Sequence, residues 1–182
     1  NMTGGQVTGT GSIHFFDSDG DPGTGTSAIN TLASATSSTI DGVGIILRQA
    51  GGTTITVADG AAAQDLVVNS VISQIAFAND TLTKAGAGTM VTTANNVYDN
   101  ATAVTAGTLL VNGDSSGATG AVTVSSGATL GGTGTVGGAT TIDANGNLAP
   151  GTTGVSDLTF SSGVTINGDF EVEVDGTAAG DA

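Results

Sequence analysis

A short glycine-led unit recurs through the second half of the chain and decides the fold. It reads Gly-Thr-Leu at 107–109, Gly-Ala-Thr-Leu at 127–130, Gly-Asn-Leu at 146–148 and Gly-Asp-Phe at 168–170. The apolar residues that close the four units are 21, 18 and 22 positions apart, and they are Leu109, Leu130, Leu148 and Phe170. Self-similarity at a period near twenty is typical of proteins that stack one coil upon another.

A second series of alternating residues keeps the same phase. Its members are 18 and 24 positions apart, and they are Val122/Val124, Thr140/Ile142 and Val164/Ile166. A meander sandwich has no reason to keep two series in step. In a solenoid, by contrast, the side chain at a given position of one coil lies above the side chain at the same position of the coil before. The sequence therefore predicts an all-β parallel β-helix, or β-solenoid, with about three short strands in each coil of roughly 20 residues.

Short alternating runs separated by glycine or by Asx-Gly pairs extend this interpretation to the whole chain. Leu66–Val68 is one such run in the first half, and Asn112-Gly113 and Asn145-Gly146 are turn signals in the second. The clear period begins only after residue 100.

Composition excludes several classes of function. The 182 residues include 16 Asp and Glu against 2 Lys and Arg, for a net charge of −14, with no Cys and one His. Disulfides, thiolate catalysis and multi-histidine metal centres are thereby excluded. Arg48 and Lys84 alone could meet phosphates, so we expect no nucleic-acid partner. No run of about eighteen apolar residues occurs, so we expect no membrane insertion within this segment.

The stretch Leu82-Thr83-Lys84-Ala85-Gly86-Ala87-Gly88-Thr89-Met90 begins a longer ordered pattern. It continues with Asn96-Val97-Tyr98, Thr102-Ala103-Val104 and Gly107-Thr108-Leu109-Leu110. The pattern resembles the autotransporter-associated β-strand repeat, also called the passenger-associated transport repeat. The resemblance covers roughly residues 82–176, and Met90 stands where the family usually has Leu. Residues 1–81 do not match the repeat. The resemblance therefore implies that residues 82–182 form the solenoid and that residues 1–81 are a β-rich N-terminal region, either a cap or irregular coils of one continuous solenoid.

This resemblance implies a right-handed parallel β-helix on a secreted or surface-displayed bacterial protein. In that family the repeat is associated with transport and folding of the passenger and with forming its stalk, and it is not catalytic. Because the chain begins at Asn1, where an open reading frame would begin with Met, we expect it to be a piece of a longer protein.

The densest group of carboxylates is Asp17, Asp19 and Asp21, at alternate positions of one turn-rich stretch. Three such side chains can converge oxygen ligands on a calcium ion. The stretch is not an EF-hand loop, because Pro22 stands at the required glycine position and Ala28 at the bidentate acid position. Calcium is the one cofactor that the sequence suggests, and a solvated acidic loop without any cofactor is the alternative.

Four other ionisable residues are candidates for chemistry, each with a simpler interpretation. We expect His14, between Ile13 and Phe15, to be exposed or at a sheet edge, and Lys84 to have a structural or solvent-facing role. Glu171 and Glu173 alternate with apolar residues, which places both carboxylates on one face of a strand. Such a pair can serve a glycosidase only when it flanks a bound sugar, and a polar solvent face is the simpler interpretation.

The sequence favours a non-catalytic structural module: a stalk, adhesin or matrix-fibre segment with a cell-surface, glycan or matrix partner. One alternative is a carbohydrate-active β-helix enzyme, either a polysaccharide lyase or a hydrolase. Lyases of this architecture pair calcium carboxylates with a basic residue, and neither cation here lies near an acidic cluster in sequence. Another alternative is a filament subunit, because exposed end coils could associate end to end by β-augmentation.

Overall fold

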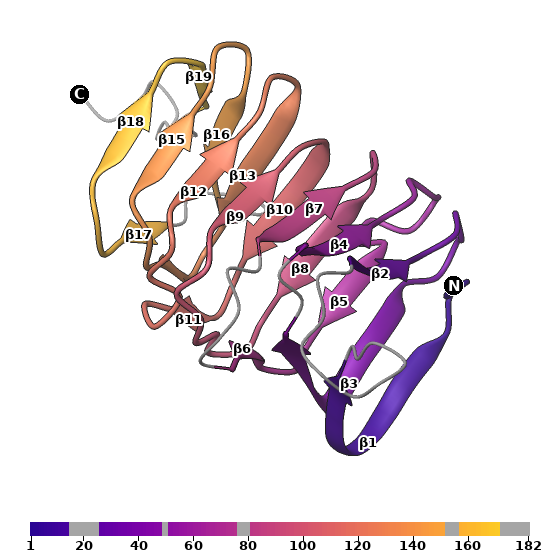
Figure 1. Cartoon of the computed structure of the whole chain (residues 1–182). Helices are drawn as coiled ribbons and strands as arrows, with labels where there is room; N and C mark the ends of the chain where they lie inside the picture. Colours follow the sequence, from indigo (N-terminus) through magenta and orange to yellow (C-terminus); the bar gives the residue numbers. More distant parts are fainter. Residues whose placement is uncertain (15–25, 49–50, 76–80, 152–156, 172–182) are drawn as a thin grey trace, which may run out of the picture.

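The computed structural model is built from parallel strands stacked along one axis, with the N-terminus at one end and the C-terminal coil at the other (Figure 1). It describes residues 1–14, 26–48, 51–75, 81–151 and 157–171. Within these ranges it has nineteen strands and no helix, and every pairing between strands is parallel. The predicted parallel β-solenoid is confirmed. No helix that could span a membrane occurs in the described ranges.

The strands form three sheets, two of which run the length of the stack. The long sheet, in order, consists of β1 (Gln6–His14), β3 (Ser38–Leu47), β5 (Leu66–Val68), β8 (Thr89–Thr92), β10 (Gly107–Val111), β13 (Ala128–Gly132), β16 (Asn147–Pro150) and β19 (Asp169–Phe170), with β6 (Ile72–Gln74) also pairing with β3. The second sheet consists of β2 (Ser27–Asn30), β4 (Thr53–Thr56), β7 (Leu82–Ala85), β9 (Thr102–Val104), β12 (Val122–Val124), β15 (Thr140–Ile142) and β18 (Val164–Ile166). The short sheet consists of β11 (Asp114–Ser115), β14 (Thr135–Val136) and β17 (Thr159–Phe160).

The recurring leucines pair in register, as the period predicts. The leucine column of the long sheet consists of Leu66, Met90, Leu109, Leu130, Leu148 and Phe170. All members except Phe170 are buried in the solenoid interior. Like side chains lie above one another because parallel pairing without a shift repeats each residue's direction from coil to coil.

A second interior column belongs to the second sheet. The aliphatic column consists of Ile29, Ile55, Lys84, Val104, Val124, Ile142 and Ile166, each paired with the next. The residues between them point outward and are mostly threonine, as at Thr123 and Thr165, which are exposed. This alternation explains the composition, because the narrow interior takes aliphatic side chains and the outer face takes hydroxyls.

Coil length departs from the expected value in the first half. Neighbours in the aliphatic column are 20, 20 and 18 residues apart from Lys84 to Ile142, but 26 and 29 apart from Ile29 to Lys84. The ten-residue β3 pairs with β5 at one end and with β6 at the other. One long strand of this coil therefore lies beside two short strands of the next coil. The expectation of roughly 20 residues is therefore wrong for these early coils.

Candidate functional site

Lys84 is the chemically distinctive residue of the solenoid interior. It lies in β7, between Ile55 and Val104 in the aliphatic column, and its side chain is 1% exposed. Of the two roles expected from the sequence, the solvent-facing one is wrong and the structural one is confirmed.

The Lys84 ammonium joins two coils. Its Nζ donates to the carbonyl oxygens of Gly86 at 2.7 Å and Gly88 at 2.6 Å, in the turn between β7 and β8. It also donates to the carbonyl of Ala106 at 2.8 Å, in the next coil. All three donors of the ammonium are thus used, which is what a buried charge requires. We call this group the lysine corner.

Asp65, from the preceding coil, supplies the opposing charge. Its carboxylate is buried and accepts from the backbone N–H of Gly60 at 2.9 Å and of Thr89 at 2.8 Å. Desolvation lowers the pKa of Lys84 to about 8, and the negative charge of Asp65 opposes part of that shift. The corner therefore depends on side chains and carbonyls from three coils.

Gly107 closes the lysine corner from the next coil. Its φ is 63°, and a Cβ there would lie 2.5 Å from the carbonyl oxygen of Gly86 and 2.6 Å from Lys84 Nζ. Side chains avoid both that conformation and contacts that short. A glycine at this position is therefore required for the ammonium and the carbonyls to meet.

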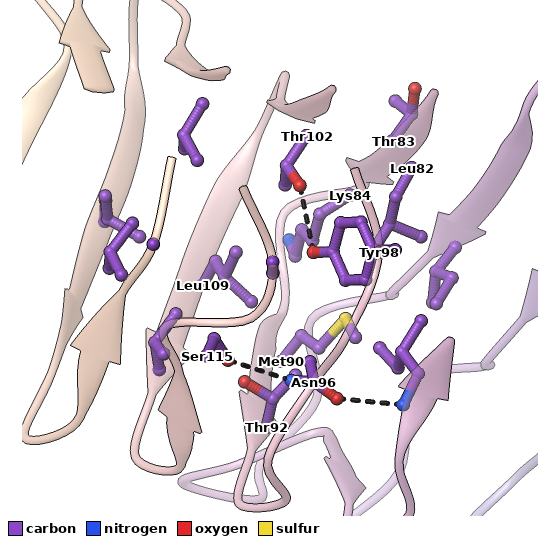
Figure 2. Close-up of a pocket in the computed structure, with 18 residues that line it drawn as sticks. Leu82, Thr83, Lys84, Met90, Thr92, Asn96, Tyr98, Thr102, Leu109 and Ser115 are labelled. Carbon is purple, nitrogen blue, oxygen red and sulfur yellow. Dashed lines mark hydrogen bonds between the residues drawn. The ribbon is translucent and has the colours of Figure 1, made fainter. Parts of the chain in front are cut away.

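Asn96 links three coils on the other side of the same interior. Its Oδ1 accepts from the backbone N–H of Ile72 at 2.9 Å, in the coil before, and its Nδ2 donates to Ser115 Oγ at 3.1 Å, in the coil after (Figure 2). Close by, the Tyr98 hydroxyl and Thr102 Oγ1 are 2.9 Å apart. The Asn-x-Tyr part of the repeat thus supplies a second polar connection between coils.

Sequence reasoning assigned no role to Asn96 or Asp65. Asn96 was marked by its place in the repeat pattern, whereas no local motif distinguishes Asp65 from the other carboxylates.

A small cavity lies between these groups. It has a volume of about 40 Å³, and Leu82, Lys84, Met90, Tyr98 and Leu109 are among its lining residues (Figure 2). Pockets for organic ligands usually have volumes of roughly 300–1,000 Å³. The cavity can accommodate water molecules but no sugar ring.

The remaining candidates do not meet in a common site. Asp17, Asp19, Asp21 and Glu173 lie outside the described residues. Glu171 follows β19 and is exposed, and its backbone N–H donates to the carbonyl of Leu148 at 2.9 Å. In the part of the chain that the structure describes, no three His, Cys, Asp or Glu side chains are grouped so as to hold a metal ion.

His14 occupies the sheet edge expected for it. It ends β1, the first strand of the long sheet, and it is exposed. Its Nδ1 lies 3.5 Å from Arg48 Nη1, at the outer limit of a hydrogen bond. The prediction of an exposed or edge-facing histidine is confirmed.

Replacing Lys84 should destabilise the solenoid without changing its surface. In Lys84→Met the carbonyls of Gly86 and Ala106 lose the donor shown here, while Gly88 still accepts from the N–H of Thr108. We expect the free energy of unfolding to fall by about 2–4 kcal/mol, measured by urea denaturation. Thr83→Ala, on the outward side of the same strand, should change it by less than about 0.5 kcal/mol. Equal effects of the two variants would contradict the role of the lysine corner.

Two glycines with positive φ allow the energetic cost of backbone strain to be measured apart from the cost of steric conflict. Gly107 and Gly127 have φ of 63° and 76°, but a Cβ at Gly127 meets nothing within 4 Å. Gly127→Ala should therefore cost about 1–2 kcal/mol for the left-handed conformation alone. Gly107→Ala should cost clearly more, because it also displaces the ammonium and its acceptors. Thermal denaturation measures the melting temperature of both variants. A larger decrease in Gly127→Ala than in Gly107→Ala would contradict the steric role assigned to Gly107.

The lowered pKa of Lys84 predicts that stability increases with pH. Between about pH 8, its value in the folded chain, and its ordinary 10.5, the unfolded chain binds more protons at this site. The free energy of unfolding should therefore rise by about 2 kcal/mol between pH 7 and 9.5. The difference between wild type and Lys84→Met, from urea denaturation at each pH, isolates this residue. A difference that is constant with pH contradicts the lowered pKa.

Comparison with known proteins finds a similarity to an autotransporter adhesin. Over 71 residues, 39% of this chain, the sequence is 49% identical to the adhesin BmaC autotransporter of Brucella suis biovar 1 (strain 1330). The chain spans about 2% of the length of that relative. No family model and no solved structure matches the chain. The similarity to an autotransporter adhesin supports an autotransporter-related origin for this sequence.

Proposed function

We propose that this chain is a non-catalytic structural segment of a bacterial surface protein, a stalk or adhesin segment of the autotransporter-passenger type. The observation that carries the proposal is the uninterrupted parallel stack, in which side chains of one coil repeat in the next from Ile29 to Ile166. The identity to an autotransporter adhesin over 39% of the chain supports a cell-surface location.

The stack suits a spacer. Each step between paired strands adds about 4.8 Å, so the six steps of the aliphatic column extend over about 29 Å. Backbone pairing between coils, and not one large core, supplies the stability of such a structure, so length can grow by adding coils. The outward threonines and serines keep the surface hydrated with few charges, which suits a protein exposed outside the cell.

The geometry favours this role over the carbohydrate-active enzyme. Lys84 is buried with all three ammonium donors used, so it is not placed to take a proton from a substrate. Glu171 is exposed at one end of the stack, far in sequence from the buried Asp65. The interior cavity of about 40 Å³ is too small for a sugar ring.

Surface display tests the proposal. The full chain, carrying an epitope tag, is placed between a secretion signal and the membrane anchor of an unrelated autotransporter. We expect the tag to reach the surface of intact cells, where added protease removes it and antibody binds it. A periplasmic marker protein that resists the protease is the control for cell integrity. Retention of the folded chain in the periplasm would contradict the proposed role.

An activity screen tests the non-catalytic part. The purified chain is incubated with neutral and acidic polysaccharides, and new reducing ends and unsaturated products are measured. We expect neither above the level of a heat-denatured sample. Reproducible turnover that is lost in Glu171→Gln would overturn the non-catalytic assignment and establish the enzyme instead.

A further inference from the structure

The interior cavity is lined by hydroxyl groups as well as by aliphatic side chains (Figure 2). The hydroxyls belong to Thr92, Tyr98, Thr102 and Ser115. Thr92 and Thr102 are each 5% exposed, and Ser115 is 7% exposed. Since these three side chains are withdrawn from bulk solvent, their hydroxyl groups depend on hydrogen-bond partners inside the solenoid.

Thr92 is the polar member of an otherwise aliphatic column. Its register partners are Val68 in the coil before and Val111 in the coil after, and both are buried. Within the ranges that the structure describes, Thr92 Oγ1 makes no hydrogen bond with another protein group. A hydroxyl has one proton to donate and two lone pairs that accept, so Thr92 faces the cavity with its full hydrogen-bonding capacity unused.

The other hydroxyls of the lining are only partly satisfied. Ser115 Oγ accepts from Asn96 Nδ2, and among the described residues no acceptor takes its own proton. The Tyr98 hydroxyl and Thr102 Oγ1 share one hydrogen bond, which uses one of their two protons. With Thr92, three hydroxyl protons around one cavity therefore lack an acceptor, although buried polar groups are nearly always paired.

Size and chemistry together select the ligand of this cavity. Its volume of about 40 Å³ exceeds the roughly 10–15 Å³ that a water molecule needs, and water requires two to four polar partners. A cation would supply no acceptor for the three protons. An anion would meet no free positive charge, because all three donors of Lys84 are already used. Water is small and neutral and accepts as well as donates.

From these observations we propose that the cavity is a water-binding site, in which ordered water accepts hydrogen bonds from the hydroxyls of Thr92 and Ser115. Thr92 lies in β8 and Ser115 in β11 of the next coil, so this water connects two coils. It adds a polar connection between the lysine corner and Asn96. The inference does not depend on the proposed surface role.

Oxygen-17 magnetic relaxation dispersion of the solvent tests the proposal on the full chain, because it detects water held inside a protein for longer than the protein tumbles. Thr92→Val replaces the hydroxyl by a methyl group of similar shape, and Ser115→Ala is the second variant. Thr123→Val, on the exposed outer face of β12, is the matched control. Circular dichroism checks that each variant folds.

We expect the wild type and Thr123→Val to give the same dispersion amplitude. The amplitude of Thr92→Val should be smaller by the contribution of at least one water molecule, and Ser115→Ala should show the same loss. Equal amplitudes in the wild type and in whichever of these two variants folds would overturn the proposal.

Xenon gives an independent readout, because it enters dry apolar cavities. In the wild type we expect xenon to leave the methyl signals of Met90 and Leu109, which line the cavity, unshifted in NMR spectra. Xenon-induced shifts of these methyl groups in the wild type would show that the cavity is dry and would also overturn the proposal.

Discussion

Parallel pairing of each coil with the next, in one fixed register, is the constraint on which the rest of this structure depends. It brings Leu66, Met90, Leu109, Leu130 and Leu148 into one buried column, although they are spread over more than eighty residues of sequence. Because the interior is narrow, each coil must supply a side chain of similar volume at each place. The shortage of aromatic residues and the abundance of glycine both follow from that requirement.

A charged residue in such a column must have its charge compensated locally. Lys84 achieves this by reaching the carbonyls two and four residues further along its own chain, where the turn folds back toward it, and the carbonyl of Ala106 in the next coil. The glycines of the turn are needed for close approach, because a Cβ at Gly86 or Gly88 would lie 2.2 Å or 2.5 Å from backbone oxygens of the preceding coil. The Lys-x-Gly-x-Gly spacing thus has a geometric cause. A buried charge that loses one partner is strongly destabilising, so the corner also favours one register over its alternatives.

Much of the fold was predictable from the sequence because coil stacking leaves a period that can be read directly. The series through Leu109, Leu130, Leu148 and Phe170 pairs residue for residue, and so does the series through Val124, Ile142 and Ile166. The early coils were harder, because long corners between Ile29 and Lys84 obscure the period. The burial of Lys84 was not predictable from composition, since a lysine between alternating residues is usually exposed. Asp65 gave no signal at all, because its role depends on a contact across 24 residues with the N–H of Thr89. The calcium prediction at Asp17, Asp19 and Asp21 stays a prediction.

Amide hydrogen exchange, followed residue by residue by NMR, tests most directly whether coils are held together through this register and the lysine corner. In the wild type, the amides of Ile72, Thr89 and Thr105, which donate from one coil to another, should be among the slowest to exchange. In Lys84→Met, exchange should accelerate from β5 to β10, on both sides of the corner, and remain slow at β12 and β15. Equal acceleration along the whole stack, or no acceleration beside the corner, would contradict the account.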